Sequence, residues 1–304
     1  MAPYLSANFY RFVALPDAAQ RREALLALCR KERVQGLILL ASEGINGSIA
    51  GAPEAVRNVL AWLRQDPLLA PLEHKESWSE KAPFRRMQVR LKAEIVTLRV
   101  PGISPTHAAG EYVPAAQWNA LLRSPDLLLI DTRNDYEVEL GSFAGALNPQ
   151  LRNFAELPAW LDAHPLIGSA ARAGGAQARV AMFCTGGIRC EKSTAYLRSR
   201  GLQQVYHLQG GILEYLEEVS PQDSLWRGEC FVFDERVSLG HGLRPGPHQL
   251  CRACRQPLPE GAMESPLFEL GVSCPRCHAS SSAAQKSGAR ERQRQWERAK
   301  ARLT

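Results

Sequence analysis

The chain has 304 residues, 45% of them hydrophobic and 22% charged, which is long enough for roughly two or three domains with buried cores. Its net charge of +6 excludes a strongly acidic protein and mildly favours an acidic partner such as nucleic acid. No apolar run approaches the ~18 residues of a membrane span, and the N-terminal residues lack the features of a signal peptide. We therefore expect a cytoplasmic protein with no membrane partner. In that reducing compartment the eight cysteines should be metal ligands or catalytic thiols rather than disulfides.

The first 102 residues show the pattern of a ferredoxin-like α+β domain. Strand patterns occur at 9–15, 36–41, 46–51, 72–75 and 87–91, and helical patterns follow Pro16-Asp17 and Pro53. The order strand, helix, hairpin, helix, strand is that of the ferredoxin-like fold. Many functions occur on that fold, so the order of elements assigns none of them.

Basic and aromatic residues are interleaved near the end of this domain. The candidates for RNA contact are Lys75, Trp78, Lys81, Phe84, Arg85 and Arg86. Basic side chains neutralise phosphates and aromatic rings stack on unpaired bases, as in proteins that bind single-stranded loops of RNA. A solvated strand face with core aromatic residues explains the same composition, so both interpretations stay open.

Residues 103–114 are rich in Gly, Pro and small side chains and are expected to form a linker. From 115 to 220, helical and strand patterns alternate, with strands at 127–131, 180–183 and 205–208. This alternation predicts an α/β domain with a parallel sheet, in which functional loops lie at the carboxyl ends of the strands.

The cysteine at the end of the second of these strands is the best candidate for a catalytic residue. Cys184 directly follows the apolar run Val180–Phe183, and a helical pattern begins a few residues later. The loop between them consists of Thr185, Gly186, Gly187 and Ile188. Glycines allow backbone N–H groups to converge on an anion, and a helix N-terminus adds partial positive charge. We therefore predict a reactive thiolate at Cys184 rather than a structural thiol.

Two further residues of this segment are assigned to the predicted catalytic site. Arg189 places a full positive charge at the same helix end. Cys190 either resolves an oxidised or persulfide form of Cys184 or is simply a small residue in the first turn of the helix. The sequence leaves these two roles of Cys190 open.

Residues 221–280 contain two Cys-x2-Cys pairs that are typical of a structural zinc site. The four candidate ligands are Cys251, Cys254, Cys274 and Cys277. Four thiolates complete the tetrahedral coordination of Zn²⁺, so the metal is expected to fold this segment rather than to catalyse a reaction. The basic tail at 281–304 shows a helical pattern from Arg290, which either contacts RNA phosphates or is a solvated terminal helix.

Three stretches of the chain resemble the rhodanese domain. They are the Cys184-x-x-Gly187-x-Arg189 loop, the strand that ends in Asp131-Thr132-Arg133, and the strand that ends in Gly210-Gly211. The resemblance implies that residues 115–220 form a rhodanese domain, in which the loop cysteine carries sulfur as a persulfide.

The sequence from Tyr10 to about Cys277 resembles the rhodanese-domain tRNA uridine hydroxylase family over nearly its whole length. The matching motifs include Ala41–Gly47, Phe84–Met87, Glu94–Thr97, Cys184–Ser193 and Cys230–Val237. The resemblance implies an oxidoreductase that uses molecular oxygen to hydroxylate C5 of the wobble uridine in the tRNA anticodon loop. It also implies that Cys184 is required.

The residues themselves indicate a reactive thiolate near a possible RNA surface. They show no iron-binding triad of His and carboxylate and no flavin or haem motif, and they identify no electron donor. Two alternatives to hydroxylation therefore remain. One is a sulfurtransferase that acts on tRNA or a small acceptor, and the other is a non-catalytic RNA-binding module. The intact Cys184 and Arg189 argue against the second alternative.

Overall fold

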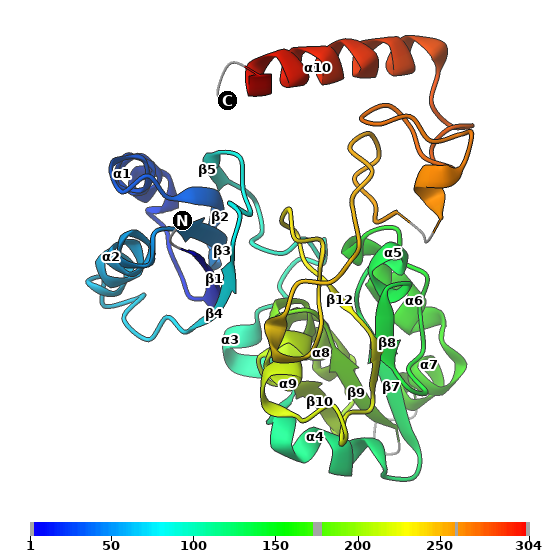
Figure 1. Ribbon diagram of the computed structural model, residues 1–304. Helices are drawn as coiled ribbons and strands as arrows, with labels where there is room; N and C mark the ends of the chain where they lie inside the picture. Colours follow the sequence, from blue (N-terminus) through cyan, green and yellow to red (C-terminus); the bar gives the residue numbers. More distant parts are fainter. Residues whose placement is uncertain (1–2, 173–177, 259–260, 302–304) are drawn as a thin grey trace.

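The computed structural model describes residues 3–172, 178–258 and 261–301 (Figure 1). The N-terminal domain is a five-stranded sheet with the strand order β4-β1-β3-β2-β5. Its elements are β1 (Tyr4–Phe12), α1 (Ala18–Lys31), β2 (Gln35–Ala41), β3 (Gly44–Gly51), α2 (Pro53–Arg64), β4 (His74–Ser79) and β5 (Met87–Leu91). All neighbours are antiparallel except β2 and β5. The predicted ferredoxin-like order of elements is confirmed, and β5 extends the sheet by one strand.

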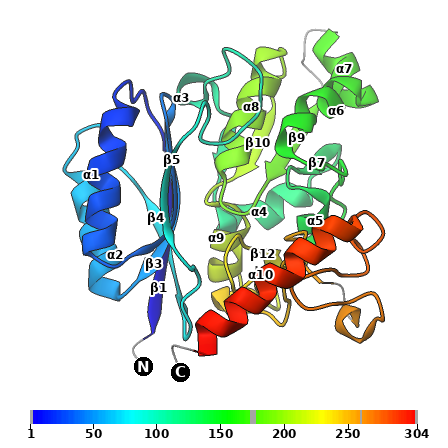
Figure 2. The same ribbon diagram turned by 90° about the horizontal axis from the view of Figure 1, so that it is seen from above.

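The two faces of this sheet have different roles because side chains alternate along each strand. Leu5, Ala7 and Phe9 of β1 are buried in the core beneath α1 and α2. The alternate residues Asn8 and Tyr10 line a cavity on the opposite face. Figure 2 shows α1 and α2 on one side of the sheet and the second domain on the other.

The second domain has a four-stranded parallel sheet with the order β6-β10-β9-β7. Its strands are β6 (Glu111–Val113), β7 (Leu127–Asp131), β9 (Arg179–Phe183) and β10 (Val205–Leu208), and its helices are α3 (Pro105–Ala108), α4 (Ala115–Leu122), α5 (Asp135–Val138), α6 (Leu157–Ala163), α7 (Pro165–Arg172), α8 (Ile188–Ser199) and α9 (Gly211–Glu218). The stretch at 103–114 thus contains α3 and β6, and β6 forms an edge of this sheet.

Strand β9 is buried on both faces, as expected for a parallel sheet that is covered on both sides. Ala181 and Phe183 belong to the core beneath α9, and Val180 and Met182 belong to the core beneath α6. This double burial explains the uninterrupted apolar run before Cys184. The predicted parallel α/β architecture is confirmed.

The C-terminal region crosses the second domain and then turns back toward the N-terminal domain (Figure 1). Strand β11 (Trp226–Gly228) pairs with β8 (Gly141–Phe143), and β12 (Cys230–Phe231) pairs with β13 (Ser238–Leu239). The final helix, α10 (Ala283–Ala301), begins earlier than the predicted helical stretch. No helix in the described ranges has the length and apolar character that crossing a membrane requires.

Candidate active site

The Cys184 thiol lies in a loop between a buried strand and the N-terminus of a helix. Strand β9 ends at Phe183, and α8 begins at Ile188. The backbone N–H of Gly187 donates a hydrogen bond to Cys184 Sγ at 3.2 Å. Gly187 has a φ of 96°, and a Cβ at this position would lie 2.8 Å from the Tyr10 hydroxyl. Glycine is therefore required here both by the backbone conformation and by the approach of the N-terminal domain.

The surroundings of Cys184 stabilise its thiolate form. Burial alone would raise the pKa of the thiol, but a hydrogen bond from the Cys190 thiol, the charge of Arg189 and backbone N–H donors lower the pKa to about 6. Burial and the neighbouring Cys184 thiolate raise the pKa of Cys190 well above its usual value. At neutral pH the pair therefore consists of a thiolate at Cys184 and a thiol at Cys190.

Arg189 is fixed by a carboxylate that is completely buried. Its Nη1 donates to Glu137 Oε2 at 2.7 Å and its Nη2 donates to Glu137 Oε1 at 2.8 Å. Nη2 also donates to Thr185 Oγ1 at 3.3 Å, which connects the arginine to the cysteine loop. The bidentate ion pair keeps the guanidinium beside the loop in one orientation.

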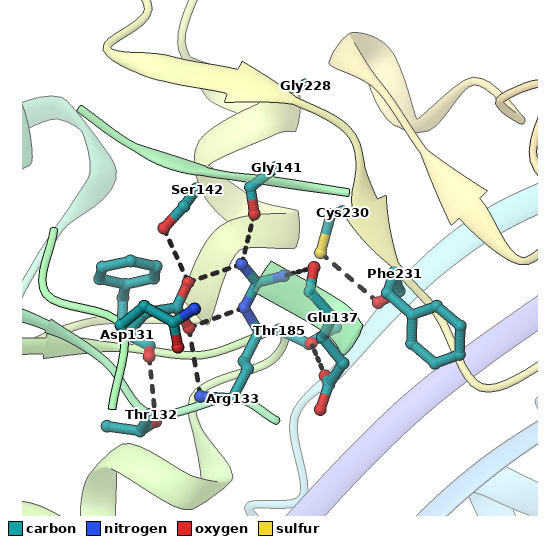
Figure 3. Close-up of polar contacts among 12 residues, drawn as sticks. Asp131, Thr132, Arg133, Glu137, Gly141, Ser142, Thr185, Gly228, Cys230 and Phe231 are labelled. Carbon is teal, nitrogen blue, oxygen red and sulfur yellow. Dashed lines mark hydrogen bonds and ion pairs between the residues drawn. The ribbon is translucent and has the colours of Figure 1, made fainter. Parts of the chain in front are cut away.

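A second buried ion pair, between Arg133 and Asp131, supports Glu137 through its backbone carbonyl. Arg133 Nε and Nη2 donate to the two carboxylate oxygens of Asp131 at 2.8 and 2.6 Å, and Arg133 Nη1 donates to the Glu137 backbone carbonyl at 3.3 Å. Ser142 Oγ also donates to Asp131. Figure 3 shows the Arg133 guanidinium among these partners. The Asp131-Thr132-Arg133 segment therefore supports the loop and does not itself line the cavity.

The N-terminal domain is joined to the cysteine helix by a buried lysine. Lys192 of α8 is 2% exposed. Its Nζ forms ion pairs with Glu43, at 2.9 Å, and with Glu94, and it donates to the Val96 carbonyl at 2.9 Å. Glu43 lies between β2 and β3, and Glu94 follows β5. The position of the N-terminal domain and the position of the cysteine helix therefore depend on each other.

A cavity of about 1400 Å³ lies between the two domains and reaches Cys184. Tyr10 from β1 and Tyr112 from β6 line it together with Glu191 from α8. Lys75 and Phe84, two of the predicted RNA-contact residues, line the same cavity. Lys75 is also ion-paired with Glu214 of α9. The cavity therefore contains the thiol loop, aromatic rings and a basic side chain.

The other four predicted RNA-contact residues lie away from Cys184. Lys81 and Arg85 line a smaller cleft of about 400 Å³, together with Arg252 and Arg255 of the C-terminal region. The ring of Trp296 of α10 lies 5.7 Å from the Arg85 guanidinium carbon and 4.1 Å from that of Arg252. Trp78 and Arg86 are exposed. Trp78 pairs with Leu5 in the sheet, so it projects to the face opposite the cavity.

The four cysteines of the C-terminal region form one compact cluster. The sulfurs of Cys251, Cys254, Cys274 and Cys277 all lie within 4.8 Å of one another. Nearest pairs of sulfurs are 3.8 to 3.9 Å apart. This donor set and spacing fit a single tetrahedrally coordinated metal ion.

Comparison with known proteins agrees with both folds and identifies the family. Residues 4–95 match the model of the UPF0176 acylphosphatase-like domain, and residues 114–218 match that of the rhodanese-like domain. The tRNA uridine(34) hydroxylase of Albidiferax ferrireducens is 61% identical over 99% of this chain and 94% of its own length. The chain belongs to the tRNA uridine(34) hydroxylase family. The enzyme of that name from Acaryochloris marina is 54% identical over 99% of this chain and 95% of its own length. The resemblance inferred from the sequence motifs is confirmed.

Sequence patterns did not reveal four residues of the site in this family member. Glu137 is the carboxylate that fixes Arg189, and its only local signal is a capping box with Asn134 at the start of α5. Tyr10, Glu191 and Lys192 lie within recognisable elements, but no spacing indicates their contacts. Tyr10 and Glu191, for example, are hydrogen-bonded although 181 residues separate them.

Proposed function

We propose that this protein is an oxidoreductase that hydroxylates C5 of the wobble uridine of tRNA in the cytoplasm, with molecular oxygen as cosubstrate. The observation that carries the proposal is a cysteine thiolate at the wall of a cavity large enough for a nucleotide. The names of its close relatives support the choice of substrate.

The thiolate provides a route to reaction at C5 of the base. The C5–C6 double bond of uracil is conjugated with the C4 carbonyl, so a thiolate that adds to C6 leaves negative charge on C5 and O4. Cys184 would form this bond, and the carbanion at C5 would then react with oxygen. Reduction of the second oxygen atom to water requires two more electrons from a reductant such as a thiol. Arg189 and the loop residues Thr185 to Ile188 would hold the sulfur in place, and Cys190 would stabilise its anionic form.

The anticodon loop is a suitable nucleic-acid structure for this cavity because its bases are unpaired. A wobble uridine must leave the stack of the loop to reach Cys184. Lys75 and Phe84 would contact the flipped nucleotide, and Lys81, Arg85 and Arg86 would contact phosphates outside the cavity. Trp78 would stack on a more distant base.

We propose that the four-cysteine cluster binds one structural Zn²⁺. Four thiolates form a closed shell, so the metal would stabilise the C-terminal region and take no part in the reaction. The region supplies Arg252 and Arg255 to the cleft beside Lys81, so its folding would also shape the RNA surface.

The function is tested by mass spectrometry of the wobble nucleoside in tRNA from cells with and without the gene. Loss of one oxygen atom on deletion, with restoration by the wild-type chain and not by Cys184→Ser, is the expected result. Cys29→Ala is the matched control, because burial raises the pKa of that thiol to about 12 and no function is assigned to it. Loss of sulfur from the nucleoside would instead support sulfur transfer and would contradict hydroxylation.

A further inference from the structure

Glu191 is a cavity-lining carboxyl in the first turn of α8, close to the cysteine loop. Tyr10 Oη donates a hydrogen bond to Glu191 Oε1 at 2.7 Å. The same hydroxyl lies 2.8 Å from the position that a Cβ on Gly187 would occupy. One tyrosine of the N-terminal domain therefore binds the carboxyl and lies close beside the loop that holds the thiolate.

The groups that face Glu191 come from four segments. They are Tyr10 of β1, Tyr112 of β6, Glu73 before β4 and Cys184 of the loop. Burial raises the pKa of Glu191, as do the charges of Cys184 and Glu73, whereas hydrogen bonds from the two tyrosines lower it. The net effect is a raised pKa. A carboxylate of this kind is a stronger base than an ordinary exposed one.

Glu191 differs from the other carboxyl groups along the cavity. Glu94, Glu214 and Asp234 are ion-paired with Lys192, Lys75 and Arg236, and Glu73 is exposed. The two cations that follow the loop on α8 are also engaged, since Arg189 pairs with Glu137 and Lys192 with Glu43 and Glu94. Among the described residues, no ion pair holds Glu191, so its carboxylate remains available to accept a proton.

We propose that Glu191 is the general base that removes the C5 proton when the hydroxylated base is released, and that Tyr10 is its positioning residue. This inference rests on the proposed function. It adds a base, and a tyrosine from the other domain, to a reaction so far assigned to the cysteine loop and to Arg189 and Cys190 of α8.

The step begins after reduction of the second oxygen atom, from a uridine with Cys184 Sγ bonded to C6 and a hydroxyl group on C5, which still carries its hydrogen. The Glu191 carboxylate takes this hydrogen as a proton, and the C–H electron pair forms the C5–C6 double bond. The C6–S bond breaks, and its electron pair leaves with sulfur as the Cys184 thiolate. The products are 5-hydroxyuridine, the thiolate and a neutral Glu191 that returns its proton to water. No oxidant or reductant is consumed in this step.

The test uses Glu191→Gln in the full chain, because glutamine keeps the size of the side chain and still accepts the Tyr10 hydrogen bond. We expect the rate of 5-hydroxyuridine formation to fall about 100-fold or more, as is typical when a general base is removed. A covalent protein–tRNA adduct should accumulate and be visible on denaturing gels. The adduct should be absent from the double variant that also carries Cys184→Ser. The rate of Cys184 alkylation by iodoacetamide should depend on pH as in the wild type, with its midpoint at a slightly lower pH.

Glu229→Gln is the matched control because Glu229 is a half-buried carboxyl outside the cavity that accepts a hydrogen bond from Ser238. It should form product at the wild-type rate without an adduct. A second variant, Tyr10→Phe, removes a hydrogen bond that lowers the pKa of Glu191. The acidic limb of the rate profile should therefore move to higher pH, because the base must be ionised and its pKa has risen.

The outcomes separate this inference from the function on which it rests. If Glu191→Gln forms product within about three-fold of the wild-type rate, or loses activity without any adduct, the base assignment is overturned while hydroxylation stands. If the wild-type chain forms no 5-hydroxyuridine, the proposed function fails, and this step fails with it.

Discussion

We propose that the Cys190 side chain affects the reaction mainly through its hydrogen bond to the Cys184 thiolate. Removing that donor in Cys190→Ala should raise the pKa of Cys184 above its value of about 6. Since only the thiolate reacts, the midpoint of iodoacetamide alkylation should move to higher pH. Hydroxylation near neutral pH should fall less than in Cys184→Ser.

An unchanged alkylation midpoint in Cys190→Ala would show that Arg189 and the backbone N–H groups stabilise the thiolate alone. Cys230→Ala is a suitable control for the loss of a buried thiol. Burial raises the pKa of Cys230 to about 12, so this residue stays protonated in the wild type.

At the level of elements, α8 connects the two domains through Lys192. Lys192→Met should leave Glu43 and Glu94 without their cation. We expect the free energy of unfolding to fall by about 3 kcal/mol. This value is at the lower end of the range for a buried ion pair because both carboxylates are partly exposed. Chemical denaturation measures this loss. Arg200→Met, which removes an exposed ion pair with Asp162, is the control and should cost about 1 kcal/mol or less.

The ion pair between Lys192 and Glu94 has a predictable pH dependence. Glu94 has a lowered pKa; burial opposes this, and the hydrogen bond from Lys192 is the largest cause that lowers it. A group with a lowered folded-state pKa contributes stability above its unfolded pKa, and this contribution is lost as the pH falls through the folded value. The wild type and Lys192→Met should therefore converge in stability under acidic conditions. A constant difference down to low pH would contradict the assignment.

The four-cysteine cluster gives a prediction for the C-terminal region. The purified protein should contain about one Zn²⁺ per chain, measured by elemental analysis, because four thiolates satisfy its coordination. A strong chelator should unfold the segment that carries the four cysteines, which has its own small core, without changing Cys184 alkylation. A metal-free protein with this region folded would show that the cysteines are packing or redox residues.

At the scale of the whole molecule, the RNA surface would extend from the cavity to α10. Neutralising Lys75, Lys81, Arg85 or Arg86 should weaken tRNA binding and reduce the slope of log affinity against log salt by about 0.7 to 0.9 per lost phosphate contact. Phe84→Ala should weaken binding while keeping the slope, since stacking involves no counterion release. Its effect should exceed that of Trp78→Ala because Phe84 lines the cavity.

Deletion of α10 provides the control for this RNA surface. It removes Arg292, Arg294 and Trp296, which lies beside Arg85. If the deletion lowers affinity and slope while the Lys75 to Arg86 substitutions change neither, RNA binds at the C-terminal helix and the proposed surface is wrong.

Local sequence patterns determined the two folds and the position of the thiol. The double burial of β9 requires an apolar run, and the loop requires glycines, so both leave a readable signal around Cys184. The paired Cys-x2-Cys motifs likewise predicted a cluster whose sulfurs do converge. These features depend on residues close together in the chain, or on spacing that chemistry fixes.

Only the tertiary structure decided which side chains surround that thiol. Glu137 lies 52 residues before Arg189, and Lys192 contacts Glu43 across 149 residues, so no local period relates them. Tyr10 and Glu191 meet because the cavity-lining face of the N-terminal sheet is turned toward the first turn of α8. A single charged or aromatic residue on a strand or helix looks the same in sequence whether it faces water or a partner, because its role depends on the packing of distant elements.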